Sequence, residues 1–288
     1  MSDKPIAILL DGDVFTYQGA SAAEYVHNFG STYHLMADME DAQRHVRNNI
    51  AQVVSDTKAK KVINTLSCPS RHYWRHDVLP DYKGSRNKTY GVSGPICLGD
   101  LKDWSADQWE TYRWKNMEAD DVMGILATDP TFLPEYTKVI VSIDKDMKTI
   151  PDVHIYNPDK DYQPWFNPAA DAEKFFMSQA IGGDTTDGYS GCKGTSVEGA
   201  GAFLGDPWFW EQYEHIFKSG KRKGEAEMRY RKSESRGLWA DIVSLYSKAG
   251  QTEQDAIVNA QVARICRHTD YDQSTGEVKL WLPKSLAH

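Results

Sequence analysis

The stretch PIAILLDGD, at residues 5–13, is an apolar run that ends in two acidic residues separated by a glycine. A short continuous apolar run is typical of a strand buried on both faces, as in parallel sheets. In open α/β sheets, ligands bind at the carboxyl ends of the strands, and Asp11 occupies such a position. The stretch therefore predicts an α/β fold with a functional site next to Asp11.

Two further apolar segments, KVINTL (61–66) and KVIVSI (138–143), predict neighbouring strands. Helices are expected over 38–60, 118–128, 169–182, 237–249 and 252–267, and KLWL (279–282) is strand-like. Strand–helix alternation followed by mainly helical sequence indicates a central, mainly parallel sheet with a helical C-terminal part. We expect a core over 1–160, with a helical gateway around 80–115, and a mainly helical region over 161–288 that is continuous with it.

Composition limits the class of protein. With 288 residues, 40% of them hydrophobic, the chain can bury a sizeable core. No apolar run approaches the roughly 20 residues needed to span a bilayer, and the N-terminus lacks the pattern of a signal peptide. We therefore expect a cytoplasmic protein without a membrane partner. The four cysteines show no CxxC spacing, which favours reduced thiols over disulfides or a zinc site.

Acidic residues form four groups that can converge on one place: Asp11/Asp13, Glu118/Asp120/Asp121, Asp144/Asp146 and Asp184/Asp187. Residues two apart share a face at an extended strand end, and residues three apart share a face of a helix. Two carboxylates about 4 Å apart repel by about 4 kcal/mol at an effective dielectric near 20, so such a cluster needs cations. Two Mg²⁺ ions, for which Mn²⁺ is expected to substitute, would activate water and stabilise a leaving oxygen. Each group taken alone is also explained by helix capping or surface charge, so the prediction depends on the combination.

Basic residues concentrate in one stretch although the chain carries a net charge of −8. Residues 218–236 hold eight Lys or Arg and three Glu, so this stretch alone is +5. It is either a DNA-contacting segment or a solvated basic loop. Lys83 and Arg86 would share a helix face and stabilise a phosphate, or lie in a solvated turn.

A glycine-rich segment follows the last acidic group. In DGYSGCKGTS, glycines at 188, 191 and 194 allow backbone N–H groups to approach a phosphate, although such a segment is also typical of a tight turn. The chain contains no Walker A loop, GxGxxG, GxSxG or HExxH pattern, which disfavours nucleotide hydrolysis, Rossmann redox and serine hydrolase chemistry.

In this order, the motifs resemble the flap endonuclease/5′-exonuclease family, particularly its members from T-seven-type podoviruses. They are LLDGD (9–13), PDYKGSR (80–86), MEADDVMG (117–124), VSIDKDMKTIP (141–151), IGGDTTDGYSG (181–191) and KSGKRKG (218–224). The resemblance implies a PIN/FEN-like fold with a helix-turn-helix and a two-metal nuclease that degrades DNA from 5′ ends. It also implies action on flaps and RNA–DNA hybrids, and a viral protein working in the host cytoplasm.

The resemblance also implies roles for individual residues. Asp11, Glu118, Asp120 and Asp144 match the residues around one metal ion, and Asp121, Asp146, Asp184 and Asp187 match those around the second. Lys83 and Arg86 match basic residues on the helix that gates the site. Gly191, Lys193 and Gly194 fall in the helix-turn-helix that holds the duplex backbone with help from a monovalent cation such as K⁺. Lys221, Arg222 and Lys223 are expected to contact DNA phosphates.

The chain departs from the family pattern at two places. Ser67 and Cys68 stand near the place where the family usually has an aspartate, and Ser196 stands where a glycine is common. The missing carboxylate leaves a catalytically impaired, structure-specific DNA-binding protein as one alternative. A haloacid-dehalogenase-like phosphatase is another, because Asp11, at a strand end, and the GDxxD pattern (183–187) suit an aspartyl nucleophile.

Overall fold

The computed structural model describes residues 4–84 and 94–286, so Arg86 lies outside the described residues. The chain forms two compact units, each built from segments that are distant in sequence. The first comprises Met1–Asp77, Arg86–Glu173 and Ile265–Lys279, and the second comprises Val78–Ser85, Lys174–Arg264 and Leu280–His288. None of the described helices combines the length and the apolar character needed to cross a membrane.

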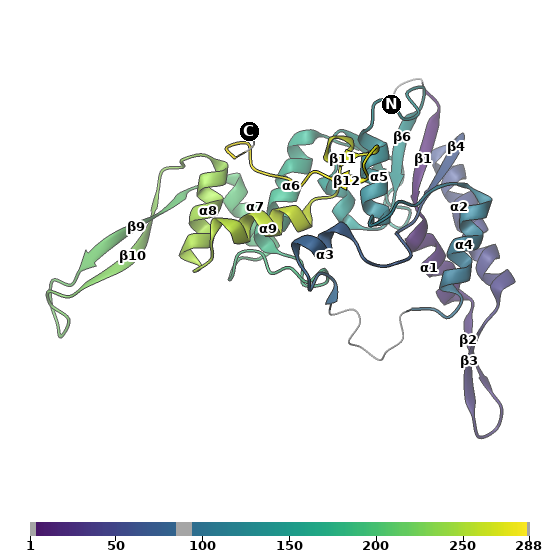
Figure 1. Cartoon of the computed structure of the whole chain (residues 1–288), viewed down its shortest axis with the longest axis horizontal. Coiled ribbons are helices and arrows are strands. Elements are labelled where there is room, and N and C mark those ends of the chain that lie inside the picture. Colours follow the sequence, from purple (N-terminus) through teal and green to yellow (C-terminus); the bar gives the residue numbers. More distant parts are fainter. Residues whose placement is uncertain (1–3, 85–93, 287–288) are drawn as a thin grey trace. The chain divides into compact units, whose positions relative to one another are not determined.

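A six-stranded sheet forms the centre of the first unit (Figure 1). Its strand order is β5 (Glu110–Tyr112), β4 (Lys61–Thr65), β1 (Ile6–Asp11), β6 (Thr137–Val141), β7 (Val153–Tyr156) and β8 (Trp165–Asn167). The first five strands run parallel, and β8 pairs antiparallel with β7 at the edge. In this register, Ile8 lies between Val62 and Val139. The predicted mainly parallel sheet is confirmed, and β1, β4 and β6 are the three predicted strands.

Helices cover both faces of this sheet (Figure 1). On one face, α1 (Gly12–Ala22), α2 (Met39–Thr57) and α4 (Leu98–Gln108) bury a cluster that includes Ile8, Leu10 and Val139. On the other face, α5 (Ala119–Thr128) packs against β1, β4 and β6. Because both faces are buried, the strands are continuously apolar rather than alternating.

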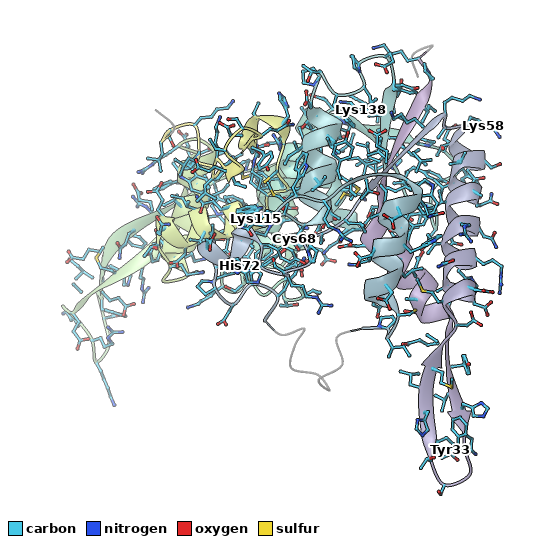
Figure 2. All side chains as sticks on the ribbon, turned by 45° about the vertical axis from the view of Figure 1, so that its right-hand side comes forward. Tyr33, Lys58, Cys68, His72, Lys115 and Lys138 are labelled. Atoms are coloured by element: carbon cyan, nitrogen blue, oxygen red, sulfur yellow. The ribbon has the colours of Figure 1, made fainter. Side chains whose placement is uncertain are left out.

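The first unit also carries short elements that the sequence did not predict. A hairpin of β2 (Glu24–Asn28) and β3 (Tyr33–Ala37) exposes large apolar side chains, and Figure 2 shows Tyr33, which is 71% exposed, near its end. A one-turn helix, α3 (Trp74–Val78), lies between β4 and α4 in sequence. The remaining elements are η2 (Lys145–Thr149), η3 (His268–Asp270), β11 (Tyr271–Asp272) and β12 (Glu277–Val278).

Helices dominate the C-terminal part of the chain, as predicted. They are α6 (Ala169–Gly182), α7 (Val197–Gly205), α8 (Leu238–Lys248) and α9 (Glu253–Ala263). Between α7 and α8, β9 (Phe209–Ile216) and β10 (Ala226–Ser233) form a two-stranded ribbon that the sequence did not predict. The predicted strand at KLWL is wrong, because Trp281 packs on the rings of Phe176 and Trp239 instead of joining a sheet.

Candidate active site

Asp11 is a buried carboxylate at the carboxyl end of the central strand. Its Oδ1 caps α1 by accepting the Val14 N–H at 3.2 Å, and its Oδ2 accepts the Ser142 hydroxyl at 2.7 Å. Burial raises the pKa of Asp11 to about 7, and the charges of Asp13 and Asp144 add to the rise. An ionised Asp11 at this position therefore calls for nearby positive charge.

Asp13 lies in the first turn of α1, because the strand ends at Asp11. The expected placement of both aspartates on one extended strand end is therefore wrong. Asp13 Oδ1 pairs with Lys102 Nζ at 2.8 Å and accepts the Ser67 N–H at 3.3 Å. The Ser67 hydroxyl in turn accepts the Ala119 N–H at 2.9 Å, so Ser67 links Asp13 to the start of α5.

Asp144 and Asp146 follow β6, but they too leave the extended strand that was expected. Asp144 caps the short helix η2 and accepts the Asp146 N–H at 2.9 Å. The Ser142 hydroxyl accepts the Asp144 N–H at 3.1 Å and also donates to Asp11. Ser142 therefore joins the acidic groups that follow two adjacent strands.

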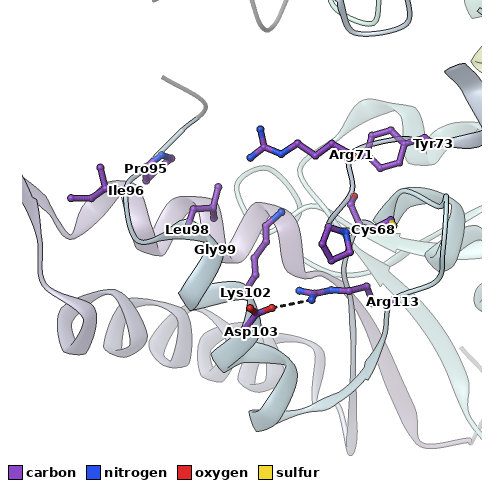
Figure 3. Close-up of a pocket in the computed structure, with 12 residues that line it drawn as sticks. Cys68, Arg71, Tyr73, Pro95, Ile96, Leu98, Gly99, Lys102, Asp103 and Arg113 are labelled. Atoms are coloured by element: carbon purple, nitrogen blue, oxygen red, sulfur yellow. Dashed lines mark hydrogen bonds and ion pairs between the residues drawn. The ribbon is translucent and has the colours of Figure 1, made fainter. Parts of the chain in front are cut away.

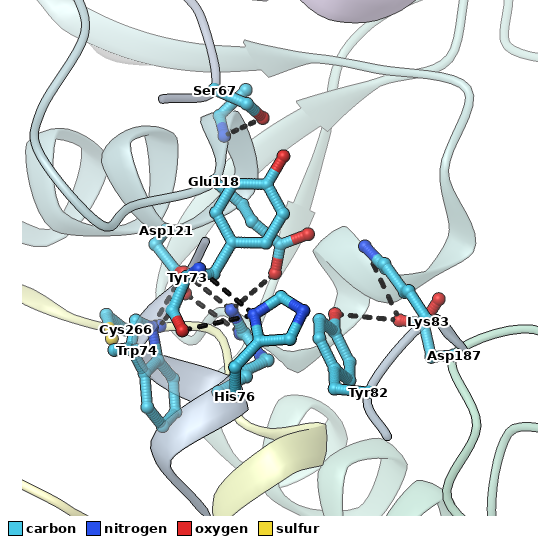
Figure 4. A network of polar contacts seen from close by, with 12 residues as sticks. Ser67, Tyr73, Trp74, His76, Tyr82, Lys83, Glu118, Asp121, Asp187 and Cys266 are labelled. Carbon is cyan, nitrogen blue, oxygen red and sulfur yellow. Dashed lines mark hydrogen bonds and ion pairs between the residues drawn. The ribbon is translucent and has the colours of Figure 1, made fainter. Parts of the chain in front are cut away.

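Two acidic residues at the start of α5, Glu118 and Asp121 (Figure 4), contact a buried arginine. Arg75 is 3% exposed, and its Nη1 donates to Glu118 Oε2 at 2.8 Å and to Asp121 Oδ2 at 2.6 Å. The predicted shared helix face of Glu118 and Asp121 is confirmed, whereas Asp120 is half-buried on another side. Burial by itself raises the pKa of Asp121, but the Arg75 guanidinium and hydrogen-bond donors outweigh it and hold this pKa below its usual range.

Asp184 and Asp187, in the second unit, lie in a turn, so they do not share a helix face. Asp184 Oδ1 accepts the Thr186 N–H at 2.8 Å and the Asp187 N–H at 3.4 Å. Asp187 Oδ2 accepts the Tyr82 hydroxyl at 3.1 Å and lies 3.8 Å from Lys83 Nζ (Figure 4). Lys83 has a φ of 54°, which ends any helical path at this residue.

We call the acidic residues that follow β1 and β6 and begin α5 the acidic edge: Asp11, Asp13, Glu118, Asp120, Asp121, Asp144 and Asp146. Their carboxylate oxygens are ligands that suit hard cations. Within the described ranges, however, no three His, Cys, Asp or Glu side chains are already arranged to hold a metal ion. The predicted ligand set therefore stays a prediction.

A pocket of about 320 Å³ opens beside Ser67 and Cys68 (Figure 3). Arg71, Lys102 and Arg113 line it, and Arg113 pairs with Asp103 at 3.0 Å. Cys68 itself is buried, and its Sγ lies 3.2 Å from the Ser70 hydroxyl oxygen. The side chains next to the pocket at Ser67 and Cys68 are therefore a hydroxyl and a thiol, and whether one of them takes the place of an aspartate stays a prediction.

The predicted DNA-backbone loop is held within the second unit by side chains. The Gly191 N–H donates to Asn259 Oδ1 at 2.9 Å, and the Lys193 N–H donates to Gln251 Oε1 at 2.7 Å. Gly191 has a φ of 61° and an added Cβ would lie 2.4 Å from the Ile181 carbonyl oxygen, so tight packing requires glycine there. At Gly194, an added Cβ would meet no described atom within 4 Å.

The basic stretch 218–236 proves to be the tip and second strand of the β9–β10 ribbon rather than an irregular loop. Arg222 in the tip pairs with Glu225 at 2.7 Å and with Glu227 at 2.8 Å, and stacks on Phe217. Lys221 and Lys223 are exposed, and no ion pair is found for either within the described part of the chain. The three predicted DNA-binding residues of the tip therefore differ in how far protein carboxylates neutralise them.

Sequence reasoning missed four residues that organise the acidic edge: Ser67, Arg75, Lys102 and Ser142. A signal for Arg75 is that it stands among apolar and aromatic residues in HYWRHDVLP, a setting in which a buried arginine needs an acidic partner. The two serines carry no comparable signal.

The fold and the acidic edge agree with the family comparison. The family described as 5′-3′ exonuclease, N-terminal resolvase-like domain, matches residues 7–176. The chain belongs to this 5′-3′ exonuclease family, which confirms the predicted enzyme class.

Two phage proteins are similar over nearly the whole chain. The exodeoxyribonuclease of Enterobacteria phage T3 is 32% identical over 301 residues, and the exonuclease of Escherichia phage T7 is 32% identical over 297 residues. Each alignment covers 98% of this chain and 94% of the phage protein. The fold is similar to that of the T5 D15 protein co-crystallized with metal ions, with a TM-score of 0.52 and 17% identity over 69% of this chain and 74% of that one.

Proposed function

We propose that this chain hydrolyses DNA phosphodiesters from 5′ ends with the help of two divalent metal ions, and that the ion is Mg²⁺. The observation that carries the proposal is the acidic edge of the sheet. Asp11 stands at the end of β1, Asp144 follows β6, and Glu118 caps the start of α5. Ser142 and Ser67 connect these elements through hydrogen bonds. Further support comes from the T3 and T7 relatives, named exodeoxyribonuclease and exonuclease, and from the T5 protein that was crystallised with metal ions.

The residues that would hold the ions are carboxylates of the first unit: Asp11, Glu118, Asp120, Asp144 and Asp146. Bound divalent cations lower the pKa of water and neutralise charge that develops on a phosphate. Ser142 orients Asp11 by donating to its Oδ2, while Lys102 balances the charge of Asp13. The roles predicted for Asp184 and Asp187, around a second ion, remain predictions.

DNA would be held through its backbone, because the candidate contacts are cations rather than base-reading side chains. We assign phosphate contacts to Lys221 and Lys223, whose charges no described carboxylate pairs with. The role expected for Lys83 at the scissile phosphate remains a prediction from the family resemblance. Flaps, RNA–DNA hybrids, the helix-turn-helix and its K⁺ remain predictions from the family resemblance.

The experiment is cleavage of a duplex labelled at its 5′ end or at its 3′ end, with Mg²⁺ and with EDTA. We expect short 5′-labelled products with Mg²⁺ only. Asp144→Asn should abolish them without unfolding the protein, because Asp144 is exposed and asparagine also caps helices well. Asp107→Asn, at an exposed position near the end of α4, is the matched control and should cleave normally.

Three outcomes would count against the proposal. Cleavage in EDTA would remove the metal requirement, and full activity of Asp144→Asn would remove the acidic edge from the chemistry. DNA that is bound but never cut, with Mg²⁺ or Mn²⁺, would instead support the impaired DNA-binding protein. Cys68→Asp would then test whether the missing carboxylate is the cause.

A further inference from the structure

The buried carboxylate of Asp121, in the first turn of α5 (Figure 4), forms an ion pair with Arg75. Arg75 Nη2 donates to Asp121 Oδ1 at 2.9 Å, and Nη1 donates to Oδ2 at 2.6 Å, so the guanidinium grips the carboxylate with two parallel bonds. Trp74 Nε1 donates to Oδ2 at 2.9 Å, and the Cys266 N–H donates to Oδ1 at 3.0 Å. Asp121 is fully buried under these donors.

The hydrogen bonds to Asp121 leave no free lone pair on its oxygens for a metal ion. An ionised carboxylate offers about four lone-pair sites on its two oxygens. Four protein donors occupy the sites of Asp121, two on each oxygen. A metal ion would have to displace at least one of these donors from a side chain with no solvent exposure. Breaking a buried ion pair leaves a charge without compensation, which is costly.

The same arginine also reaches Glu118. Its Nη1 donates to Glu118 Oε2 at 2.8 Å, so one nitrogen bridges the two acidic side chains. Stacking of the guanidinium on the Trp74 ring, 4.5 Å from its centroid, fixes the plane of the fork. Asp121 holds the guanidinium through two bonds, and the same guanidinium donates one bond to the Glu118 carboxylate.

We propose that Asp121 is not a metal ligand but the buried counterion that locks Arg75, and that Arg75 is a positioning residue that orients Glu118 toward the metal ion. This inference rests on the proposed metal-dependent function. It assigns the two neighbouring acids of α5 different roles, since Asp120 is half-buried and Asp121 is sealed from solvent.

The test is Mn²⁺ binding to the full chain without DNA, measured by equilibrium dialysis, with folding checked by circular dichroism in EDTA. In Arg75→Lys a single ammonium nitrogen replaces the planar fork, so the two parallel bonds to Asp121 and the fixed orientation of the donor toward Glu118 are lost. We expect Mn²⁺ binding about 10-fold weaker or more, as for other residues that orient metal ligands. The Mg²⁺ concentration for half-maximal cleavage should rise by the same factor, while KM for DNA stays unchanged. Arg44→Lys, in an exposed ion pair on α2, is the matched control.

A second variant remains informative if Arg75→Lys fails to fold. Trp74→Phe removes one neutral donor and frees one lone pair of Asp121. If Asp121 were a ligand, Mn²⁺ would bind more tightly to this variant, and that result would overturn the inference. Binding that is unchanged or weaker supports it.

The remaining outcomes separate the inference from the proposed function. If folded Arg75→Lys binds Mn²⁺ as tightly as the wild type does, the positioning role is overturned and the metal site stands. A wild-type chain that binds no Mn²⁺ at all would overturn the metal site and the positioning role together.

Discussion

The lysines at the tip of the β9–β10 ribbon offer a prediction whose size follows from the structure. Along the ribbon, Arg231 stacks on Tyr213 and pairs at 2.7 Å with Glu211, a carboxylate that Arg236 also contacts at 3.0 Å, so its charge is partly balanced. At the tip, Lys221 and Lys223 are exposed and have no ion pair within the residues described. We expect the double variant Lys221→Ala/Lys223→Ala to lose two phosphate contacts.

The magnitude comes from counterion release. Each phosphate contact contributes about 0.9 to the slope of log affinity against log salt concentration, so two lost contacts reduce the slope by about 1.8. Between about 50 and 200 mM salt, the advantage of the wild type over the variant should then shrink about twelvefold. The ribbon arginine should behave differently, because Glu211 already offsets part of its charge.

The assay is fluorescence anisotropy of a labelled duplex in EDTA, which prevents metal-dependent cleavage, over a series of salt concentrations. Arg231→Ala serves as the control, and its slope should fall less than that of the double lysine variant. A double lysine variant with the wild-type slope would refute the reasoning and leave the tip as a solvated turn. A large loss of slope in Arg231→Ala would show that ribbon ion pairs open on DNA.

Three further predictions concern stability. Gly12→Ala should destabilise the fold by about 1–3 kcal/mol in urea denaturation, because its Cβ would lie 2.1 Å from Asn64 Oδ1 and 2.7 Å from the Thr65 carbonyl oxygen. If this variant is as stable as the wild type, Asn64 and Thr65 of β4 can shift away from the added methyl group at little cost. Tyr246→Phe should cost about 1–3 kcal/mol, since the buried hydroxyl donates to the Ala180 carbonyl oxygen at 2.7 Å; an unchanged denaturation midpoint would show that this bond contributes nothing. Burial lowers the pKa of His154 from 6.5, so its neutral form is favoured in the folded state. That stability is complete above pH 6.5 and is lost as pH falls through the lowered pKa. The drop in melting temperature between about pH 7.5 and about pH 5 should therefore be smaller in His154→Gln, and an equal drop would contradict the shift.

Local patterns sufficed for the elements that are buried along their whole length. The apolar runs of β1, β4 and β6 and the periodic helices α2 and α5 are visible in the sequence, since burial on both faces or on one stripe leaves a regular signature. The β2–β3 hairpin and the β9–β10 ribbon escaped prediction because their exposed strands mix polar, charged, aliphatic and aromatic residues. KLWL looked like a strand although ring packing holds Trp281.

By itself, the sequence determined the parallel α/β core, the family and the acidic residues that follow its strands. All three are visible in local sequence patterns, because apolar runs that end in aspartates recur along the chain. Only the tertiary structure decided which carboxylates are already neutralised, because the partners come from distant segments: Arg75 meets Asp121 across 46 residues, and Lys102 reaches back to Asp13. An ion pair of this kind depends on how deeply the two side chains are buried and on how they are oriented toward each other, and neither leaves a periodic pattern in the sequence.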